Sequence, residues 1–305
     1  VKPALLEESG LAAKRRKGEG HYDRFRDRVI IPIRDARGRV VAFGGRILGD
    51  GEPKYLNSPE TLIFNKRRLL FGLDRAHRAI ARTGFAIVVE GYMDAISVAA
   101  AGIENVVASL GTAFTVEQAK LLLRYAPELR FCYDSDAAGQ EATLRALSLA
   151  RTAGASVKVL RLPDGKDPDE YIRKHGKDAF EKVIETALPF IEYRMVRVLE
   201  TADRESLQGR LDALSALLPV LAEVRSPAEL DGCILRTARE LTLDEGLIRA
   251  ELGSRSFCTA RCCTRNDAPR FQEGGRRPAP CGARRASDSV ARCARHRARR
   301  RARAL

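Results

Sequence analysis

A short apolar run that ends abruptly in carboxylates is the feature that most constrains this fold. Residues 85–89 are continuously apolar, as expected for a parallel strand that is covered on both faces. Glu90 and Gly91 follow at once, and a helical pattern begins after the glycine, with Asp94 about one turn into it. In an open α/β sheet, ligands bind at the edge where the strands end. The stretch therefore predicts a β-α unit that places Glu90 and Asp94 at such an edge.

Three further strand-like runs predict that this unit belongs to a parallel sheet. Residues 105–109, 129–133 and 156–162 are strand-like, and helical patterns separate them. Right-handed crossovers place the carboxyl ends of parallel strands on one edge. Two of these runs are followed by acidic residues, namely Asp134, Asp136, Asp164, Asp167 and Asp169. The sequence thus predicts that carboxylates from three β-α units converge.

Carboxylates that share one cleft repel one another, and this repulsion raises their pKa values unless a cation compensates it. Hard oxygen ligands without a His or Cys cluster favour Mg²⁺ or Mn²⁺. We therefore expect two or more such ions. The expected ligands are Glu90, Asp94, Asp134, Asp136, Asp167 and Asp169. The alternative is that these residues are ordinary solvated loop carboxylates.

A basic segment with an aromatic residue precedes the predicted sheet. Residues 29–33 and 39–47 predict a β-hairpin, and Pro32 predicts that its first strand is an edge strand or is bulged. The polar residues that follow include Arg46, Lys54, Tyr55, Asn57 and Lys66. Spacing alone leaves two interpretations equal: an ordinary charged surface, or a strip that holds single-stranded template or nucleotide phosphates.

Several motifs together resemble a known family. The residues 90–94 (EGYMD), 134–139 (DSDAAG) and 164–170 (DGKDPDE) resemble the Toprim domain, which bacterial primases, topoisomerases and some nucleases share. The flanking residues 22–28 (YDRFRDR), 43–46 (FGGR) and 54–61 (KYLNSPET) resemble the polymerase core of bacterial replicative DNA primase, the DnaG type. The resemblance covers roughly residues 1–250.

The resemblance implies an α/β Toprim-like sheet that synthesises short RNA primers on DNA by metal-dependent nucleotidyl transfer. Glu90, Asp134 and Asp136 would be the catalytic carboxylates, and Arg46, Lys54, Tyr55, Asn57 and Lys66 would bind template and nucleotide. The implied partners are single-stranded DNA, ribonucleoside triphosphates and, in the full-length family member, a replicative helicase. No zinc is expected in this stretch of the family.

Composition and pattern divide the chain into four expected parts. Residues 1–84 would be the later portion of the N-terminal subdomain of the core, residues 85–175 the Toprim domain and residues 176–253 a helical segment. In the helical segment, Ser226 and Thr242 each open a motif with capping-box spacing, and Thr115 does the same within the predicted sheet. The helical segment also contains leucines at four-three spacing, namely Leu207, Leu211, Leu214, Leu218 and Leu221. The fourth part is residues 254–305.

The last part departs from the pattern of a folded domain. Residues 255–305 contain 15 Arg, no Lys and 3 acidic residues, a net charge of +12 out of +14, which leaves +2 for residues 1–254. Few large apolar side chains remain there, so we expect a disordered tail. Its composition fits GC-rich coding sequence read in a shifted frame. A zinc site built from its five cysteines and His296 is the alternative, but the spacing matches no standard finger.

Three rival functions remain at this stage. A topoisomerase or nuclease could use the same Toprim core, although a topoisomerase also needs a nucleophilic tyrosine in a separate domain. A haloacid-dehalogenase-type phosphatase would open its domain with the Asp-x-Asp motif, whereas Asp134 follows two earlier β-α units. The third rival is a non-catalytic nucleic-acid-binding piece of a primase, since no Cys/His cluster precedes Cys132. No long apolar run or secretory signal is visible, so a cytoplasmic location without membrane contact is expected.

Overall fold

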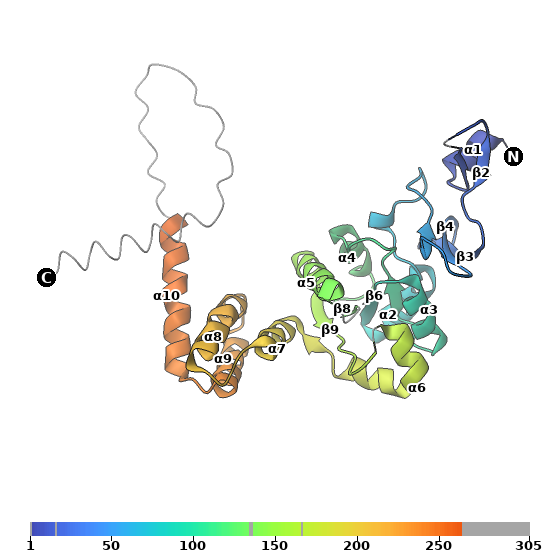
Figure 1. Cartoon of the computed structure of the whole chain (residues 1–305). Coiled ribbons are helices and arrows are strands. Elements are labelled where there is room, and N and C mark those ends of the chain that lie inside the picture. Colours follow the sequence, from blue (N-terminus) through green and yellow to red (C-terminus); the bar gives the residue numbers. More distant parts are fainter. Residues whose placement is uncertain (1, 16, 134–136, 166, 264–305) are drawn as a thin grey trace, which may run out of the picture. The chain divides into compact units, whose positions relative to one another are not determined.

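The computed structural model describes residues 2–15, 17–133, 137–165 and 167–263 (Figure 1). The chain divides into two compact units, Val1–Arg255 and Ser256–Leu305. All of the candidate site described below belongs to the first unit. None of the helices in the described ranges combines the length and the apolar character that a bilayer crossing requires.

The N-terminal part contains two small antiparallel sheets. Helix α1 (Pro3–Glu8) precedes the pair β1 (Ala12–Lys14) and β2 (His21–Asp23). A three-stranded sheet follows, in the order β3-β4-β5. Its strands are β3 (Arg28–Arg34), β4 (Val40–Ile47) and β5 (Tyr55–Asn57).

The predicted hairpin is confirmed by the pairing of β3 with β4. Strand β3 is an edge strand, and its register shifts between Ile33 and Arg34. Pro32 lies within this strand, opposite Phe43. An edge position with a nearby irregularity is where a residue without a backbone N–H is tolerated.

The central sheet has the strand order β10-β9-β8-β6-β7. Its four parallel strands are β6 (Phe85–Val89), β7 (Val106–Ala108), β8 (Glu128–Cys132) and β9 (Ser156–Val159). They confirm the predicted runs, although β9 ends three residues before the expected position. Strand β10 (Leu188–Pro189) pairs antiparallel with β9. It was not predicted, because two residues are too few to show an alternation of apolar and polar side chains.

Helices cover both faces of the central sheet, as the continuous apolar character of β6 requires. On one face, α2 (Leu73–Thr83), α4 (Val116–Leu122) and α5 (Ala137–Thr152) pack against Ala86 and Val88. The other face buries Ile87 and Val89 with two helices and part of the N-terminal sheet. Those helices are α3 (Tyr92–Ala100) and α6 (Pro168–Glu185).

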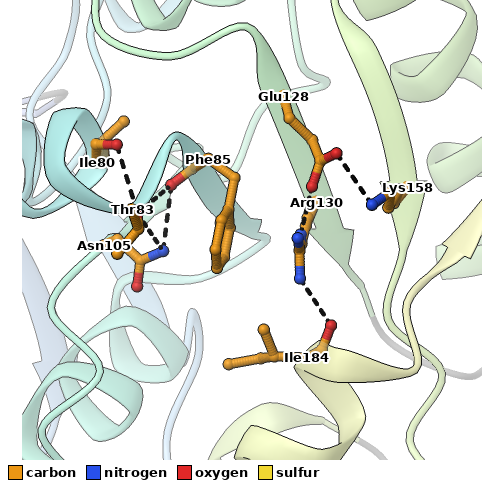
Figure 2. Close-up of polar contacts among 8 residues, drawn as sticks. All are labelled: Ile80, Thr83, Phe85, Asn105, Glu128, Arg130, Lys158 and Ile184. Atoms are coloured by element: carbon orange, nitrogen blue, oxygen red, sulfur yellow. Dashed lines mark hydrogen bonds and ion pairs between the residues drawn. The ribbon is translucent and has the colours of Figure 1, made fainter.

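A polar cluster lies near the edge of the central sheet that is opposite to the strand carboxyl ends (Figure 2). The Arg130 guanidinium donates to Glu128 Oε1 at 2.6 Å and to the Ile184 carbonyl at 2.7 Å, and it lies 3.7 Å from the centre of the Phe85 ring. Lys158 Nζ lies 3.0 Å from the other Glu128 oxygen. Since Ile184 is in the last turn of α6, Arg130 ties that end of α6 to the sheet.

The predicted helical segment is confirmed as four helices. These are α7 (Phe190–Thr201), α8 (Leu207–Leu221), α9 (Pro227–Leu241) and α10 (Glu245–Cys263). Leu214, Leu218 and Leu221 of the predicted leucine repeat are buried, whereas Leu207, at the start of α8, is 60% exposed. Ser226 caps α9 by accepting from the Glu229 N–H.

Two expectations for this segment are corrected. Thr242 does not open a capping box: it ends α9 in the left-handed conformation, with φ of 50°, and the Asp244 carboxylate accepts from the Leu247 N–H instead. Helix α10 continues to Cys263, ten residues past Gly253, where the sequence predicts the end of regular structure. Residues 264–305 lie outside the described residues, so the rest of the tail prediction is untested.

Candidate active site

A cavity of about 430 Å³ lies where the strand ends of the central sheet meet the N-terminal part of the chain. Four of the predicted carboxylates line it, namely Glu90, Asp94, Asp167 and Asp169. Four residues of the predicted basic strip line it as well, namely Arg46, Lys54, Tyr55 and Asn57. The fold therefore brings two groups that are far apart in sequence to one cavity.

Glu90 and Asp94 occupy the positions that the strand-to-helix pattern predicts. Glu90 follows the last residue of β6, and extended Gly91 is the N-cap of α3. Asp94, in the first turn of α3, accepts from the Gly91 N–H at 3.1 Å and is only 9% exposed. A carboxylate at this position is stabilised by the N-terminal end of the helix dipole.

Asp167 and Asp169 reach the cavity from the start of α6. Asp167 is the N-cap, and its Oδ1 accepts from the Glu170 N–H at 2.8 Å. Asp169 Oδ1 accepts from Ser97 Oγ at 2.5 Å, and Oδ2 lies 3.2 Å from an Arg173 nitrogen. Each of these carboxylates is thus oriented by protein donors.

The donor set fits a hard divalent cation, because every acidic group around the cavity offers oxygen. Among the described residues, however, no three His, Cys, Asp or Glu side chains form a group able to hold a metal ion. Asp94, Asp167 and Asp169 each accept a hydrogen bond from a protein group. Asp134 and Asp136 lie outside the described residues, so their place in the predicted metal site is untested.

Three residues of the basic strip lie on β4 and β5, namely Arg46, Tyr55 and Asn57, and Lys54 directly precedes β5. Arg46 and Tyr55 are paired residues of these strands. The Tyr55 ring has Arg46 Cζ at 5.9 Å and Lys54 Nζ at 5.7 Å from its centre, and it meets Tyr92 edge-on at 5.5 Å. Tyr55 is 41% exposed, so part of its ring faces solvent. Burial is the main cause that raises the Tyr55 pKa, and its hydroxyl stays protonated at neutral pH.

Lys66 is the one strip residue that does not line this cavity. It begins η1 (Lys66–Arg68), a 3-10 turn that α4 holds in place. The Gln118 amide donates to the Lys66 carbonyl at 3.0 Å and to the Leu69 carbonyl at 2.9 Å. The predicted capping box at Thr115 is confirmed, and it orients the fully buried Gln118.

Tyr92 forms a part of the cavity wall that the sequence patterns did not identify. It is 4% exposed, and its hydroxyl has no hydrogen-bond partner among the described residues. Burial raises the pKa of Tyr92 to about 12. A methyl group on Gly44 would lie 3.1 Å from Tyr92 and 3.2 Å from Asn57 Oδ1, so this glycine allows the close packing. The position of Tyr92 in the sequence, between Glu90 and Asp94, is the feature from which its place in the cavity wall could have been predicted.

The turn after β7 supplies backbone to the same cavity. Asn57 Nδ2 donates to the Leu110 carbonyl at 3.1 Å, and Ser109 Oγ donates to the Glu90 carbonyl at 3.1 Å. Gly111 has a φ of 66° and lines the cavity. The turn after β7 thus reaches the cavity through Gly111.

Two family models match the chain. Residues 1–77 match the N-terminal domain of the DNA primase catalytic core, and residues 87–172 match a Toprim-like model. The boundary between the two matches falls within residues 78–86, close to the predicted boundary at residue 84.

The chain is similar to named DNA primases. It is 46% identical to the DNA primase of Clostridium acetobutylicum over 244 residues, which is 80% of this chain and 40% of that protein. It is 46% identical to the DNA primase of Escherichia coli K12 over 206 residues, 67% of this chain and 36% of that protein. The chain therefore spans about two fifths of the length of these relatives.

Solved structures show the same likeness over most of their length. A DNA primase domain from Pseudomonas aeruginosa matches with a TM-score of 0.66 and 40% identity, covering 82% of this chain and 78% of that one. A DnaG primase catalytic domain bound to single-stranded DNA matches with a TM-score of 0.65 and 40% identity, covering 80% and 77%. With the cavity geometry, the two family models and these likenesses together, the chain belongs to the DnaG-type DNA primase family.

Proposed function

We propose that this chain carries the polymerising centre for DNA-templated synthesis of RNA primers. One observation carries the proposal: Arg46, Lys54 and Tyr55 line the same cavity as Glu90 and Asp94. Nucleotidyl transfer needs both groups, because phosphates must be held while charge develops at the reacting oxygens.

The carboxylates would hold Mg²⁺ or Mn²⁺. Glu90, Asp134 and Asp136 are the proposed main ligands, and Asp94, Asp167 and Asp169 would complete the site or hold further ions. Two divalent cations, when bound there, would activate the 3′-hydroxyl and neutralise the leaving pyrophosphate. Supporting this assignment, Asp94, Asp167 and Asp169 are already oriented around the cavity by hydrogen bonds to protein groups.

The basic strip would bind the substrates. Arg46 and Lys54 are the proposed phosphate contacts, and the part-exposed Tyr55 ring offers a face on which a base can stack. The Asn57 amide nitrogen donates to the Leu110 carbonyl, and its amide oxygen is buried with no hydrogen-bond partner among the described residues.

A single-stranded DNA template and ribonucleoside triphosphates are the proposed ligands. The similar DnaG primase catalytic domain that is bound to single-stranded DNA supports the template assignment. A helicase contact, which the resemblance implies, stays a prediction with no residue assigned to it.

The test is extension of an RNA primer annealed to single-stranded DNA, with labelled ribonucleotides and Mn²⁺. We expect the chain to add ribonucleotides, and Glu90→Gln to reduce the rate by about 100-fold or more. Asp178→Asn, on the exposed side of α6, is the control and should leave the rate unchanged. A wild-type chain that binds Mn²⁺ and DNA but adds no ribonucleotide would support the non-catalytic alternative instead.

A further inference from the structure

Asp169 has two different donors, one on each carboxylate oxygen. Ser97 Oγ donates to Oδ1 at 2.5 Å from α3, the helix that also carries Asp94. Arg173 pairs with Oδ2 at 3.2 Å from the next turn of α6. The two donors differ in environment: Ser97 lies where α3 and α6 pack together, whereas the Arg173 side chain is 71% exposed.

Arg173 lies at the cavity although its charge is opposite to that of the predicted metal ligands. It faces the same space as Arg46 and Lys54, but it comes from α6 rather than from the N-terminal sheet. Neither the predicted basic strip nor the predicted metal site includes it. Its neighbour along the cavity, Asp169, is a proposed metal ligand.

We propose that Arg173 is a phosphate-binding residue, and that its ion pair with Asp169 keeps it from binding phosphate until a metal ion is present. Before a metal binds, the guanidinium balances the Asp169 charge. With a divalent cation held by Asp169, Arg173 would be released from this ion pair and would bind the triphosphate of the incoming nucleotide. The inference rests on the proposed function, and it adds the residue that couples occupation of the metal site to nucleotide binding.

Physical chemistry favours this exchange. An ion pair between residues i and i+4 on an exposed helix surface is weak and is easily broken. A guanidinium near a metal ligand would otherwise repel the incoming cation, so the released position is also electrostatically preferred. Its planar group of N–H donors fits phosphate oxygens in pairs. Ser97 meanwhile keeps Asp169 in place, because its contact with Oδ1 does not depend on Arg173.

The test measures two affinities of the whole chain, for Mn²⁺ alone and for ATP at saturating Mn²⁺. In Arg173→Ala we expect Mn²⁺ to bind about two- to fivefold more tightly, because a competing cation is lost. ATP should bind about tenfold more weakly, because a phosphate contact is lost. Arg173→Lys should recover only part of the ATP affinity, since an ammonium cannot bind in the paired geometry.

Arg82→Ala is the matched control. Arg82 is 72% exposed and pairs with Glu104 at 3.3 Å, but it does not line the cavity. It should change neither affinity. The opposite signs of the two effects are the signature, because a general loss of structure would weaken both.

Four outcomes would overturn the proposal. Unchanged affinities in Arg173→Ala would show that the arginine is only a surface ion pair. Weaker binding of both ligands would show a structural role. A wild-type chain that binds no Mn²⁺ would overturn the proposed metal site and this inference together. If Glu90→Gln weakens Mn²⁺ binding but Arg173→Ala does not alter it, only the role of the arginine is contradicted.

Discussion

Ser97 Oγ donates a 2.5 Å hydrogen bond to Asp169 Oδ1 and so joins α3 to α6, across 72 residues of sequence. Helix α3 carries Asp94, and α6 carries Asp169, with Asp167 as its N-cap. The bond therefore fixes two of the three acidic segments relative to each other. Polar groups of this kind, which orient a ligand without touching the metal, strongly affect metal affinity.

Ser97→Ala should weaken Mn²⁺ binding by about tenfold, because Asp169 loses the donor that orients it. Titration of the chain with Mn²⁺, followed by electron paramagnetic resonance of the free ion, measures this. Ser148→Ala is the control, since that hydroxyl donates to the Leu144 carbonyl on the surface of α5. Equal Mn²⁺ affinity in Ser97→Ala and wild type would show that Asp169 needs no such orientation.

Lys54→Ala should weaken binding of single-stranded DNA and lower the slope of log affinity against log salt by about 0.7 if Lys54 contacts one phosphate. Lys66→Ala should have a smaller effect, because Lys66 does not line the cavity. Fluorescence anisotropy at several salt concentrations measures both. Lys120→Ala, exposed on α4, controls for general charge. If Lys54→Ala behaves like the control, the strip is an ordinary charged surface.

Gly44→Ala should lower stability by about 1 kcal/mol and weaken ATP binding, since the added methyl group presses on Tyr92 and Asn57. Urea denaturation and ATP titration measure the two effects. Gly49→Ala is the matched control, because nothing lies within 4 Å of its added methyl group. Wild-type stability and ATP affinity in Gly44→Ala would mean that Tyr92 and Asn57 can move away from the added methyl group at no cost.

Acid should destabilise the chain partly through Glu128. Burial raises the pKa of this carboxyl, but hydrogen bonds from Lys158 and Arg130 outweigh burial and hold it below its ordinary value of 4.5. A pKa that is lower in the folded state gives stability above the unfolded value, and this stability is lost as pH falls through the folded value.

Glu128→Gln should therefore be less stable than wild type at pH 7, with a difference that shrinks as the pH is lowered from about 4.5. Urea denaturation at pH 7 and at successively lower pH measures it. Glu104→Gln removes an exposed partner of Arg82 and should show little difference at any pH. A constant difference between Glu128→Gln and wild type down to about pH 3 would contradict the assigned cause.

The sequence was most informative where a local pattern determines the structure. Continuous apolar runs predict β6 and β7 because both faces of the sheet are covered. The Thr115 capping box and the Pro32 edge strand are likewise local effects. The pair β1 with β2 and the strand β10 were missed, since two or three residues are too few to show an alternation of apolar and polar side chains.

Contacts between distant residues could not be predicted in the same way. The strip and the carboxylates were each identified, but only the resemblance placed them at one centre. Ser97 and Arg173 were missed because an isolated serine or arginine on a helix is common and its partner is set by packing. The Thr242 prediction was wrong because capping-box spacing also fits a residue that ends the preceding helix, as φ of 50° shows.

The most direct test of the central claim is Mn²⁺ binding by wild type, Glu90→Gln, Asp136→Asn and Asp178→Asn, with circular dichroism to confirm that each variant is folded. The account predicts that Glu90→Gln and Asp136→Asn each weaken Mn²⁺ binding by at least about tenfold, and that Asp178→Asn binds as wild type does. Folded Glu90→Gln and Asp136→Asn variants with wild-type Mn²⁺ affinity would contradict it.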